Sequence, residues 1–119
     1  MKALLLVAHG SRRAESNDEV VALADELRSK CAGQYCVVNA AFLELAHPLI
    51  PAGIERCIAE GAQAIRVLPY FLNSGRHVTE DIPNIVNEAS QRFPGVDITV
   101  APHIGASPLM MGLLTESAE

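Results

Sequence analysis

Two histidines each follow an apolar run with the composition of a buried β-strand. His9 comes directly after residues 3–8, and His77 follows residues 65–70 after a short loop. These runs are predicted to be the first and third strands of a parallel α/β sheet. In such sheets ligands bind at the carboxyl ends of the strands, where the strand order reverses, and in the flavodoxin-like order that point lies between strands 1 and 3. Two imidazoles facing one cleft suit a transition metal or proton transfer.

A carboxylate and two further histidines are expected near the same edge. Glu44 follows the second predicted strand, beside the first, so it is a candidate metal ligand or base; the alternative is a solvated loop carboxylate. His47 adjoins Pro48 at a predicted helix start and is interpreted as a surface or capping group. His103 follows the fourth strand, further from the crevice, and a direct role for it is the less favoured interpretation.

Basic and apolar residues flank the two principal histidines. Gly10 allows a tight turn toward a helix N-terminus, which favours anions, and Arg12 and Arg13 add positive charge there. The alternative is that these arginines are solvated side chains without a role in binding. The loop after the third strand is apolar at its start and polar at its tip. It suits packing on a flat, apolar ligand, or it only covers the sheet end; its residues are Tyr70, Phe71, Leu72, Asn73, Ser74, Gly75 and Arg76. Asp81 either holds His77 or favours the helix dipole, and the dipole role is preferred.

Strand and helix patterns alternate four times along the chain. Strands are predicted at residues 2–8, 36–42, 64–69 and 97–101. The first helix is predicted from about Ser16, with a capping box to Glu19, or from one turn earlier. Further helices are predicted at about 48–60, from about 79 to 93, and from Ser107 to about Leu114. Such apolar strands are expected to be buried on both faces, with helices on both sides of the sheet. The fold class is therefore a three-layer αβα domain with a four-stranded parallel sheet of order 2-1-3-4.

Composition narrows the possible functions. The 119 residues suit a single domain, 1–119, with a modest core. A net charge of −5 argues against bulk nucleic-acid binding. No apolar run approaches the length of a membrane span, and residues 4–8 are too short for a signal peptide, so the expected location is cytoplasmic. The three cysteines lack zinc-site spacing and are expected to be ordinary buried or half-buried thiols. Dinucleotide, P-loop and α/β-hydrolase motifs are absent, and no triad spacing makes Ser11 a nucleophile.

The predicted last helix carries more apolar surface than one inward-facing stripe needs. Its apolar residues are Leu109, Met110, Met111, Leu113 and Leu114. Some of this surface is expected to meet another subunit.

The residues described above together resemble the short-form sirohydrochlorin chelatases, the CbiX and SirB type of class II chelatase. The resemblance covers nearly the whole chain. It rests on the segment 8–12 (Ala-His-Gly-Ser-Arg), on Phe42-Leu43-Glu44 before Pro48, and on 68–72 (Leu-Pro-Tyr-Phe-Leu) leading to Gly75-Arg76-His77 and Asp81-Ile82-Pro83.

This resemblance implies a chelatase-like, flavodoxin-related fold and insertion of a divalent metal into sirohydrochlorin, a precursor of sirohaem and cobalamin. It places the two metal-site histidines at His9 and His77 and an acidic partner at Glu44. It also implies that the chain is one half of a two-lobed architecture and works as a homodimer. Co²⁺, Fe²⁺ or Ni²⁺ would be a substrate, with no permanently bound cofactor. Residues expected to contact the ring are Ser11, Arg12, Tyr70, Phe71, Leu72, Gly75 and Arg76.

Two rival functions remain open at this point. His9 beside a glycine and arginines also suits a phosphohistidine enzyme, although that chemistry does not need His77 on an apolar loop. A non-catalytic module that carries a metal or tetrapyrrole is the alternative of a different class.

Overall fold

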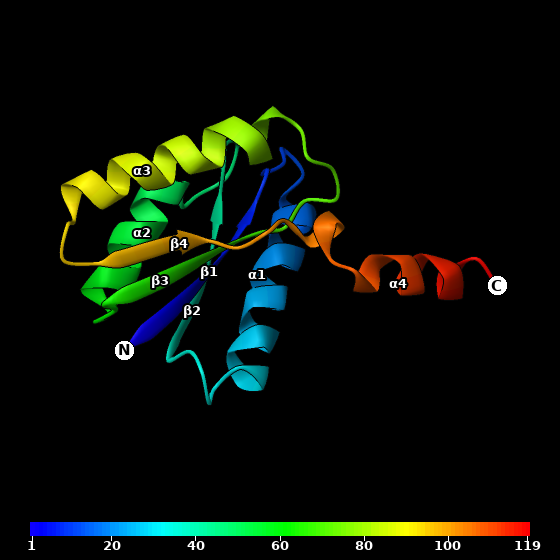
Figure 1. Cartoon of the computed structure of the whole chain (residues 1–119), viewed down its shortest axis with the longest axis horizontal. Helices are drawn as coiled ribbons and strands as arrows, with labels where there is room; N and C mark the ends of the chain where they lie inside the picture. The colour runs from blue at the N-terminus through cyan, green and yellow to red at the C-terminus, as the bar shows by residue number, and fades with distance from the viewer.

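The computed structural model describes residues 1–119 and contains one four-stranded parallel sheet of order β2-β1-β3-β4, which confirms the predicted order. The strands are β1 (Lys2–Ala8), β2 (Val37–Phe42), β3 (Ala64–Pro69) and β4 (Asp97–Val100). The helices are α1 (Ala14–Lys30), α2 (Ile50–Ala59), α3 (Ile82–Arg92) and α4 (Leu109–Ser117) (Figure 1). Two short turns complete the chain, the π-helical turn η1 (His77–Asp81) and the 3₁₀ turn η2 (Ile104–Ala106).

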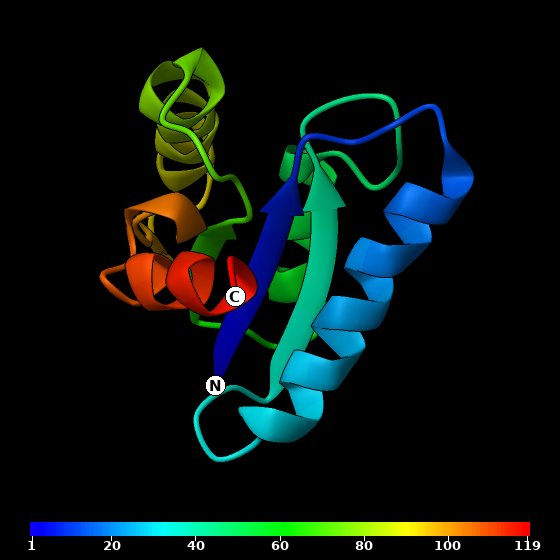
Figure 2. The ribbon, with the colours of Figure 1, turned by 90° about the vertical axis from the view of Figure 1, so that its right-hand side faces the viewer.

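The central strand β1 divides the core into two parts because its side chains alternate between the faces of the sheet. Ala3, Leu5 and Val7 pack with residues of α2 and α3 on one face. Leu4 and Leu6 pack with residues of α1 on the other. Figure 2 shows α1 standing apart from α2 and α3 across the sheet. The three-layer αβα architecture is therefore present as predicted.

The expectation that all strands are buried on both faces is wrong for β3 and β4. In β3 the side chains alternate between buried and half-buried, and in β4 Asp97 and Thr99 are exposed. The exposed positions lie on the face covered by α1, and α1 packs mainly against β1 and β2. One helix is too narrow to cover four strands, so the α1-side face of β3 and β4 stays open to solvent.

The start of α1 also differs from the prediction. The helix begins at Ala14 and includes Ser16, so the proposed capping box does not exist. Instead the side-chain oxygen of Asn17 accepts the N–H of Ser11 (3.0 Å), and the Asn17 amide donates to the Ser11 carbonyl (2.8 Å). The Ser11 hydroxyl accepts the N–H of Arg13 (3.0 Å). These bonds tie the turn after β1 to the first turn of α1.

The last helix, α4, projects from the body of the domain (Figure 1). It runs three residues beyond the predicted end at Leu114, and none of its residues is buried. Leu109 is 80% exposed and Met111 is 70% exposed. The apolar surface expected on this helix is thus present and has no partner within the chain. No helix of the structure has the length and apolar character needed to cross a membrane.

The three cysteines are expected to differ in reactivity. Cys36 is exposed, contrary to the expectation that all three thiols are at least half-buried, whereas Cys57 is fully buried. Burial raises the pKa of the Cys57 thiol, and the thiolate is the reactive form. Native protein treated with iodoacetamide at pH 8 should be alkylated at Cys36, and at Cys57 only after denaturation. Equal labelling rates in peptide mass spectra would contradict this placement.

Candidate metal site

The register of the sheet brings the ends of β1, β2 and β3 to one edge. Ala8 lies opposite Phe42 in β2, and Val7 lies opposite Pro69 in β3. Backbone hydrogen bonds continue past the strands: the N–H of Glu44 donates to the carbonyl of His9 (3.0 Å), and the N–H of Tyr70 donates to that of Val7 (2.7 Å). His9 is therefore held between the segments that carry Glu44 and the loop leading to His77.

Gly10 makes the close approach of His9 to Glu44 possible. Its φ is +97°, in the left-handed region that favours glycine. A Cβ at this position would overlap the carbonyl oxygen of Glu44 and come within 3.4 Å of the Cβ of Phe42. Glycine is therefore required at this position for two reasons: the positive φ and the close approach of the two loops.

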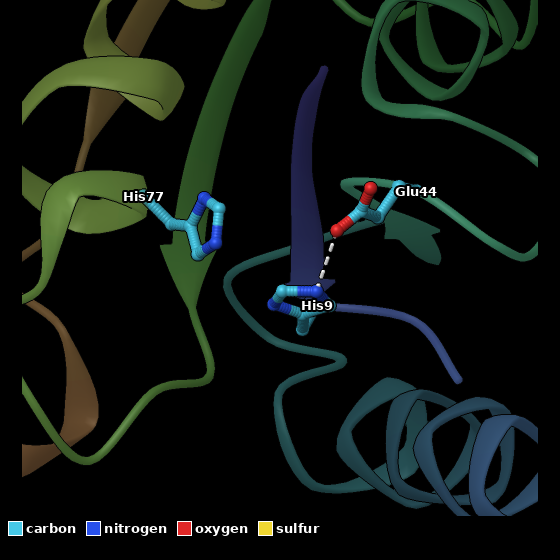
Figure 3. A group of neighbouring side chains, drawn as sticks. All are labelled: His9, Glu44 and His77. Atoms are coloured by element: carbon cyan, nitrogen blue, oxygen red, sulfur yellow. Dashed lines mark hydrogen bonds and ion pairs between the residues drawn. The ribbon is translucent and has the colours of Figure 1, made fainter.

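His9, Glu44 and His77 form the single cluster of potential metal ligands in the structure. One ligand atom from each residue lies within 4.8 Å of the others. His9 Nε2 lies 2.7 Å from Glu44 Oε2, and the rings of His9 and His77 meet edge to face with centroids 4.7 Å apart. Figure 3 shows the His9 ring between Glu44 and His77. The predicted convergence of the histidines and the placement of Glu44 beside them are both present.

A second carboxylate orients His77 from within η1. Asp81 Oδ2 lies 2.7 Å from His77 Nδ1, one helical turn away. The N–H of Ile82 donates to the His77 carbonyl five residues back, which marks this turn as π-helical, a feature frequent at functional sites. The preferred interpretation of Asp81 as a helix-dipole residue is therefore replaced by a direct contact with His77. The four-residue spacing between the two was the signal in the sequence.

The two carboxylates determine which ring nitrogens are free. An ionised carboxylate only accepts hydrogen bonds, so the nitrogen facing it must carry the proton. Neutral His9 then donates from Nε2 to Glu44 and keeps a lone pair on Nδ1. Neutral His77 donates from Nδ1 to Asp81 and keeps a lone pair on Nε2. Two imidazole lone pairs are thus available for a divalent cation, which is the arrangement common in metal sites.

The cluster lies at the surface and is open to solvent. The side chains of His9, Glu44 and His77 are 43%, 53% and 41% exposed. A metal bound there keeps open positions for water or a further ligand, in contrast to a closed structural site. The arrangement therefore suits a metal that arrives and leaves.

The loop after β3 provides an apolar surface beside the cluster. Tyr70, Phe71 and Leu72 line a pocket of about 260 Å³. Phe71 is half-buried and packs on the core under α2 and α3, whereas Tyr70 and Leu72 are 44% and 68% exposed. Of these three apolar side chains, only Phe71 is accounted for by covering the end of the sheet. Tyr70 and Leu72 remain candidates for contact with an apolar ligand.

The other predicted site residues are placed as follows. Arg12 is exposed and forms no ion pair, while Arg13 pairs with Glu15 and Arg76 with Glu80, each at 3.3 Å. Gly75 lies two residues before η1, and its carbonyl accepts the N–H groups of Val78 and Thr79. Ser11 is half-buried, and its polar groups form the hydrogen bonds to Arg13 and Asn17 described above. His47 is exposed, as expected, and His103 precedes η2; neither belongs to the cluster.

The fold and the cluster together define an α/β protein with two histidines and one carboxylate, all potential metal ligands, at the carboxyl edge of its sheet. A model of the CbiX family matches residues 3–119, and the chain belongs to this family.

Three known proteins illustrate the similarity. A sirohydrochlorin ferrochelatase of Priestia megaterium is 33% identical over 98% of this chain and 43% of its own length. A sirohydrochlorin cobaltochelatase of Sulfolobus acidocaldarius is 33% identical over 100% of this chain and 91% of its own. The crystal structure of the sirohydrochlorin chelatase SirB from Bacillus subtilis subspecies spizizenii in complex with cobalt superposes with a TM-score of 0.87. Its sequence identity is 30%, over 98% of this chain and 49% of that one. The chain spans about half the length of several curated relatives that it matches.

Replacing Gly10 by alanine is expected to disturb the site. The new Cβ needs an unfavourable φ and displaces Glu44, so the free energy of unfolding should fall by more than about 1 kcal/mol, and Co²⁺ binding should weaken. Gly33→Ala is the matched control, since a Cβ at Gly33 meets nothing within 4 Å. Denaturant titration and Co²⁺ titration measure both effects. If the two variants behave alike, Gly10 does not set the geometry of the loops.

Replacing Asp81 by asparagine is expected to weaken Co²⁺ binding by about 10- to 100-fold, because His77 loses the partner that fixes its tautomer and orientation. The fold should be unchanged, since Asp81 lies at the surface of the turn. Glu80→Gln is the control, because the neighbouring carboxylate pairs with Arg76 and not with a histidine. Unchanged affinity in the Asp81 variant, measured by calorimetry, would mean that this ion pair has no bearing on the metal.

Proposed function

We propose that this protein inserts Co²⁺ or Fe²⁺ into sirohydrochlorin, for cobalamin or sirohaem biosynthesis. The observation that carries the proposal is the pair of imidazoles whose lone pairs are left free by carboxylate partners, next to an exposed apolar loop. Relatives named as sirohydrochlorin ferrochelatase and cobaltochelatase support this substrate and both metals.

The reaction exchanges one divalent cation for two protons. The metal first binds to Nδ1 of His9 and Nε2 of His77, while the macrocycle lies against Tyr70 and Leu72. As the ring nitrogens take the metal, the two lone pairs become free, and each accepts one of the two pyrrole protons. Two histidines thus match two protons, and the net charge of the site and its contents does not change. The carboxylates of Glu44 and Asp81 stabilise the imidazolium ions that result.

Arginines near the cluster suit the acidic substituents of the macrocycle. Arg12 has no ion-pair partner, so it is available without cost. Arg76 is 80% exposed and would exchange Glu80 for a substrate carboxylate, which costs little because surface ion pairs are worth about 0–1 kcal/mol.

The active unit in this proposal is a homodimer in which residues 1–119 of each chain form one lobe. A single sheet edge is narrower than a tetrapyrrole, so one subunit covers part of the ring. The matches to about half of longer relatives support two lobes per active unit.

Phosphoryl transfer through His9 is disfavoured by the structure. His9 Nε2 faces the carboxylate of Glu44 at 2.7 Å, so a phosphoryl group on that nitrogen would bring like charges together, and transfer through Nδ1 would not need His77 or the apolar loop. A carrier that binds metal or tetrapyrrole without turnover uses the same cluster and has to be separated by experiment.

Mixing the protein with sirohydrochlorin and Co²⁺ or Fe²⁺ separates these functions. Conversion of the absorption spectrum to that of the metallated ring, faster than the spontaneous rate, supports the chelatase. A ring that binds but stays unmetallated identifies a carrier. If the ring neither binds nor takes up metal, sirohydrochlorin is not the ligand of this protein. Folded protein that accelerates insertion of neither metal would refute the proposal.

Replacing His9 or His77 by alanine should nearly abolish insertion with little change in thermal stability, because both side chains lie outside the core. Glu44→Gln should slow the reaction less, since the metal ligands remain. His47→Ala is the matched control, because this histidine lies in the loop between β2 and α2, outside the cluster, and His103→Ala should also be mild. Initial rates are compared after subtraction of the uncatalysed rate. Wild-type rates in both cluster variants would place the reaction elsewhere.

A further inference from the structure

The loop after β3, residues 70–76, carries the two exposed apolar side chains assigned above to the macrocycle, Tyr70 and Leu72. We infer that Gly105 is a positioning residue for this contact. Through the turn η2 it fixes the backbone at Phe71 and Leu72, so that the Leu72 side chain is already in place when the ring binds. This inference rests on the function proposed above and names a residue outside the metal cluster that sets the affinity for the ring.

Both ends of this loop are held next to the cluster. At its start, the N–H of Tyr70 donates to the carbonyl of Val7 (2.7 Å). At its end, the carbonyl of Gly75 accepts two N–H groups of η1, each at 3.0 Å. The ends of the loop are therefore fixed by the strand before His9 and by the turn that contains His77.

The middle of the loop, residues 71–74, takes part in a single backbone hydrogen bond, and the donor of that bond lies in η2. The N–H of Gly105 donates to the carbonyl of Phe71 (3.0 Å). The side chain of Phe71 packs on the core under α2 and α3, whereas Leu72 is 68% exposed. Burial in the core thus fixes Phe71, and the position of Leu72 depends on η2.

The contact between η2 and Leu72 leaves no room for a side chain at Gly105. A Cβ there would overlap the carbonyl oxygen of Leu72 and lie 2.9 Å from the Leu72 Cα. The positive-φ residues of the chain do not include Gly105, so glycine is needed here for the close approach and not for an unusual backbone conformation. The backbone of η2 therefore lies directly against the peptide of Leu72, and a shift of one segment must shift the other.

The turn η2 is itself held by the sheet and by a bond across the turn. The N–H of Ala101 donates to the carbonyl of Val67 (2.8 Å), which continues the pairing of β3 and β4 to their carboxyl ends. Two residues further on, the carbonyl of His103 accepts the N–H of Ala106 (3.0 Å). Figure 1 shows η2 beside the loop that follows β3. The turn is thus a fixed support for that loop.

A loop backbone that is fixed in advance favours ring binding over metal binding. An unrestrained loop would have to order its backbone when the ring packs on it, and this cost would reduce the affinity for the ring. The metal ligands of the cluster are His9, Glu44 and His77, and none of them lies in the loop or in η2. Loss of the restraint should therefore weaken ring binding and leave Co²⁺ binding unchanged.

Replacing Gly105 by alanine should weaken the binding of metal-free sirohydrochlorin by about 10-fold, because the new Cβ displaces the peptide of Leu72. Co²⁺ affinity without the ring should stay the same, and in the insertion assay KM for the ring should rise while kcat persists. Gly95→Ala is the matched control, since a Cβ at Gly95 meets nothing within 4 Å. Unchanged ring affinity, or equal losses of ring and Co²⁺ affinity, would overturn the inference.

A double-mutant cycle with Leu72→Ala separates positioning from general damage to the loop. Leu72→Ala removes the side chain that Gly105 places, so this change alone should weaken ring binding. In the Leu72→Ala background, Gly105→Ala should cost little further affinity, because both changes remove the same contact. Losses that simply add would mean that Gly105 affects the ring by another route, which contradicts the inference.

Amide hydrogen exchange of the wild type tests the restraint even if Gly105→Ala fails to fold. In the ring-free protein the N–H of Gly105 should be protected, whereas that of Asn73, which has no backbone partner, should exchange freely. Protection of Gly105 that develops only after sirohydrochlorin is added would overturn the inference. A wild type that binds the ring no better than Gly105→Ala removes the inference and leaves the chelatase intact, and a wild type that binds no ring refutes both.

Discussion

The pairing of β1 with both β2 and β3 is the constraint on which the site depends. Because the three strands are parallel, their carboxyl ends meet at one edge, and the register leaves His9 between the segments that follow its neighbours. Burial of apolar side chains favours compactness but does not select one register by itself. The backbone bonds beyond the strand ends, from Glu44 to His9 and from Tyr70 to Val7, extend that register into the loops. The positions of the cluster residues therefore follow from the sheet.

Within that frame, electrostatics rather than packing orients the reactive groups. The rings of His9 and His77 are half-exposed and receive little steric guidance from the core. Each is instead held by one carboxylate at 2.7 Å, Glu44 in one case and Asp81 in the other. Charge-assisted hydrogen bonds of this kind are short and directional, and they also set the tautomer. The chemistry of the site can thus be altered at these carboxylates without disturbing the two apolar cores.

Apolar runs and turn residues were sufficient to predict the strands, their order and the approach of His9 to His77. These features depend on local composition and on the handedness of crossovers, which hold for parallel sheets in general. The role of Asp81 was assigned to the dipole because a contact at four-residue spacing depends on side-chain orientation within a π-helical turn. The capping box at Ser16 is absent because the helix already begins at Ala14, and the N–H of Ser16 donates to the Arg13 carbonyl (3.1 Å). The exposed side of β3 and β4 does not follow from the strand patterns, because coverage depends on where α1 packs, and α1 packs mainly against β1 and β2.

The α1-side face of β3 and β4 and the cluster of His9, Glu44 and His77 are both exposed because the chain is small. Four strands need helices on two faces, and one of the two faces is covered by α1 alone. The turn η2 connects the two regions, since Gly105 is pressed against the loop that carries Tyr70 and Leu72, and α4 begins four residues later. The turn η2 restrains this apolar loop within the chain, because the N–H of Gly105 donates to the Phe71 carbonyl (3.0 Å). Restraining a surface before a ligand binds lowers the entropy lost on binding. The contact between η2 and the loop therefore bears on the affinity for a flat ligand, even though no residue of η2 lies in the cluster of His9, Glu44 and His77.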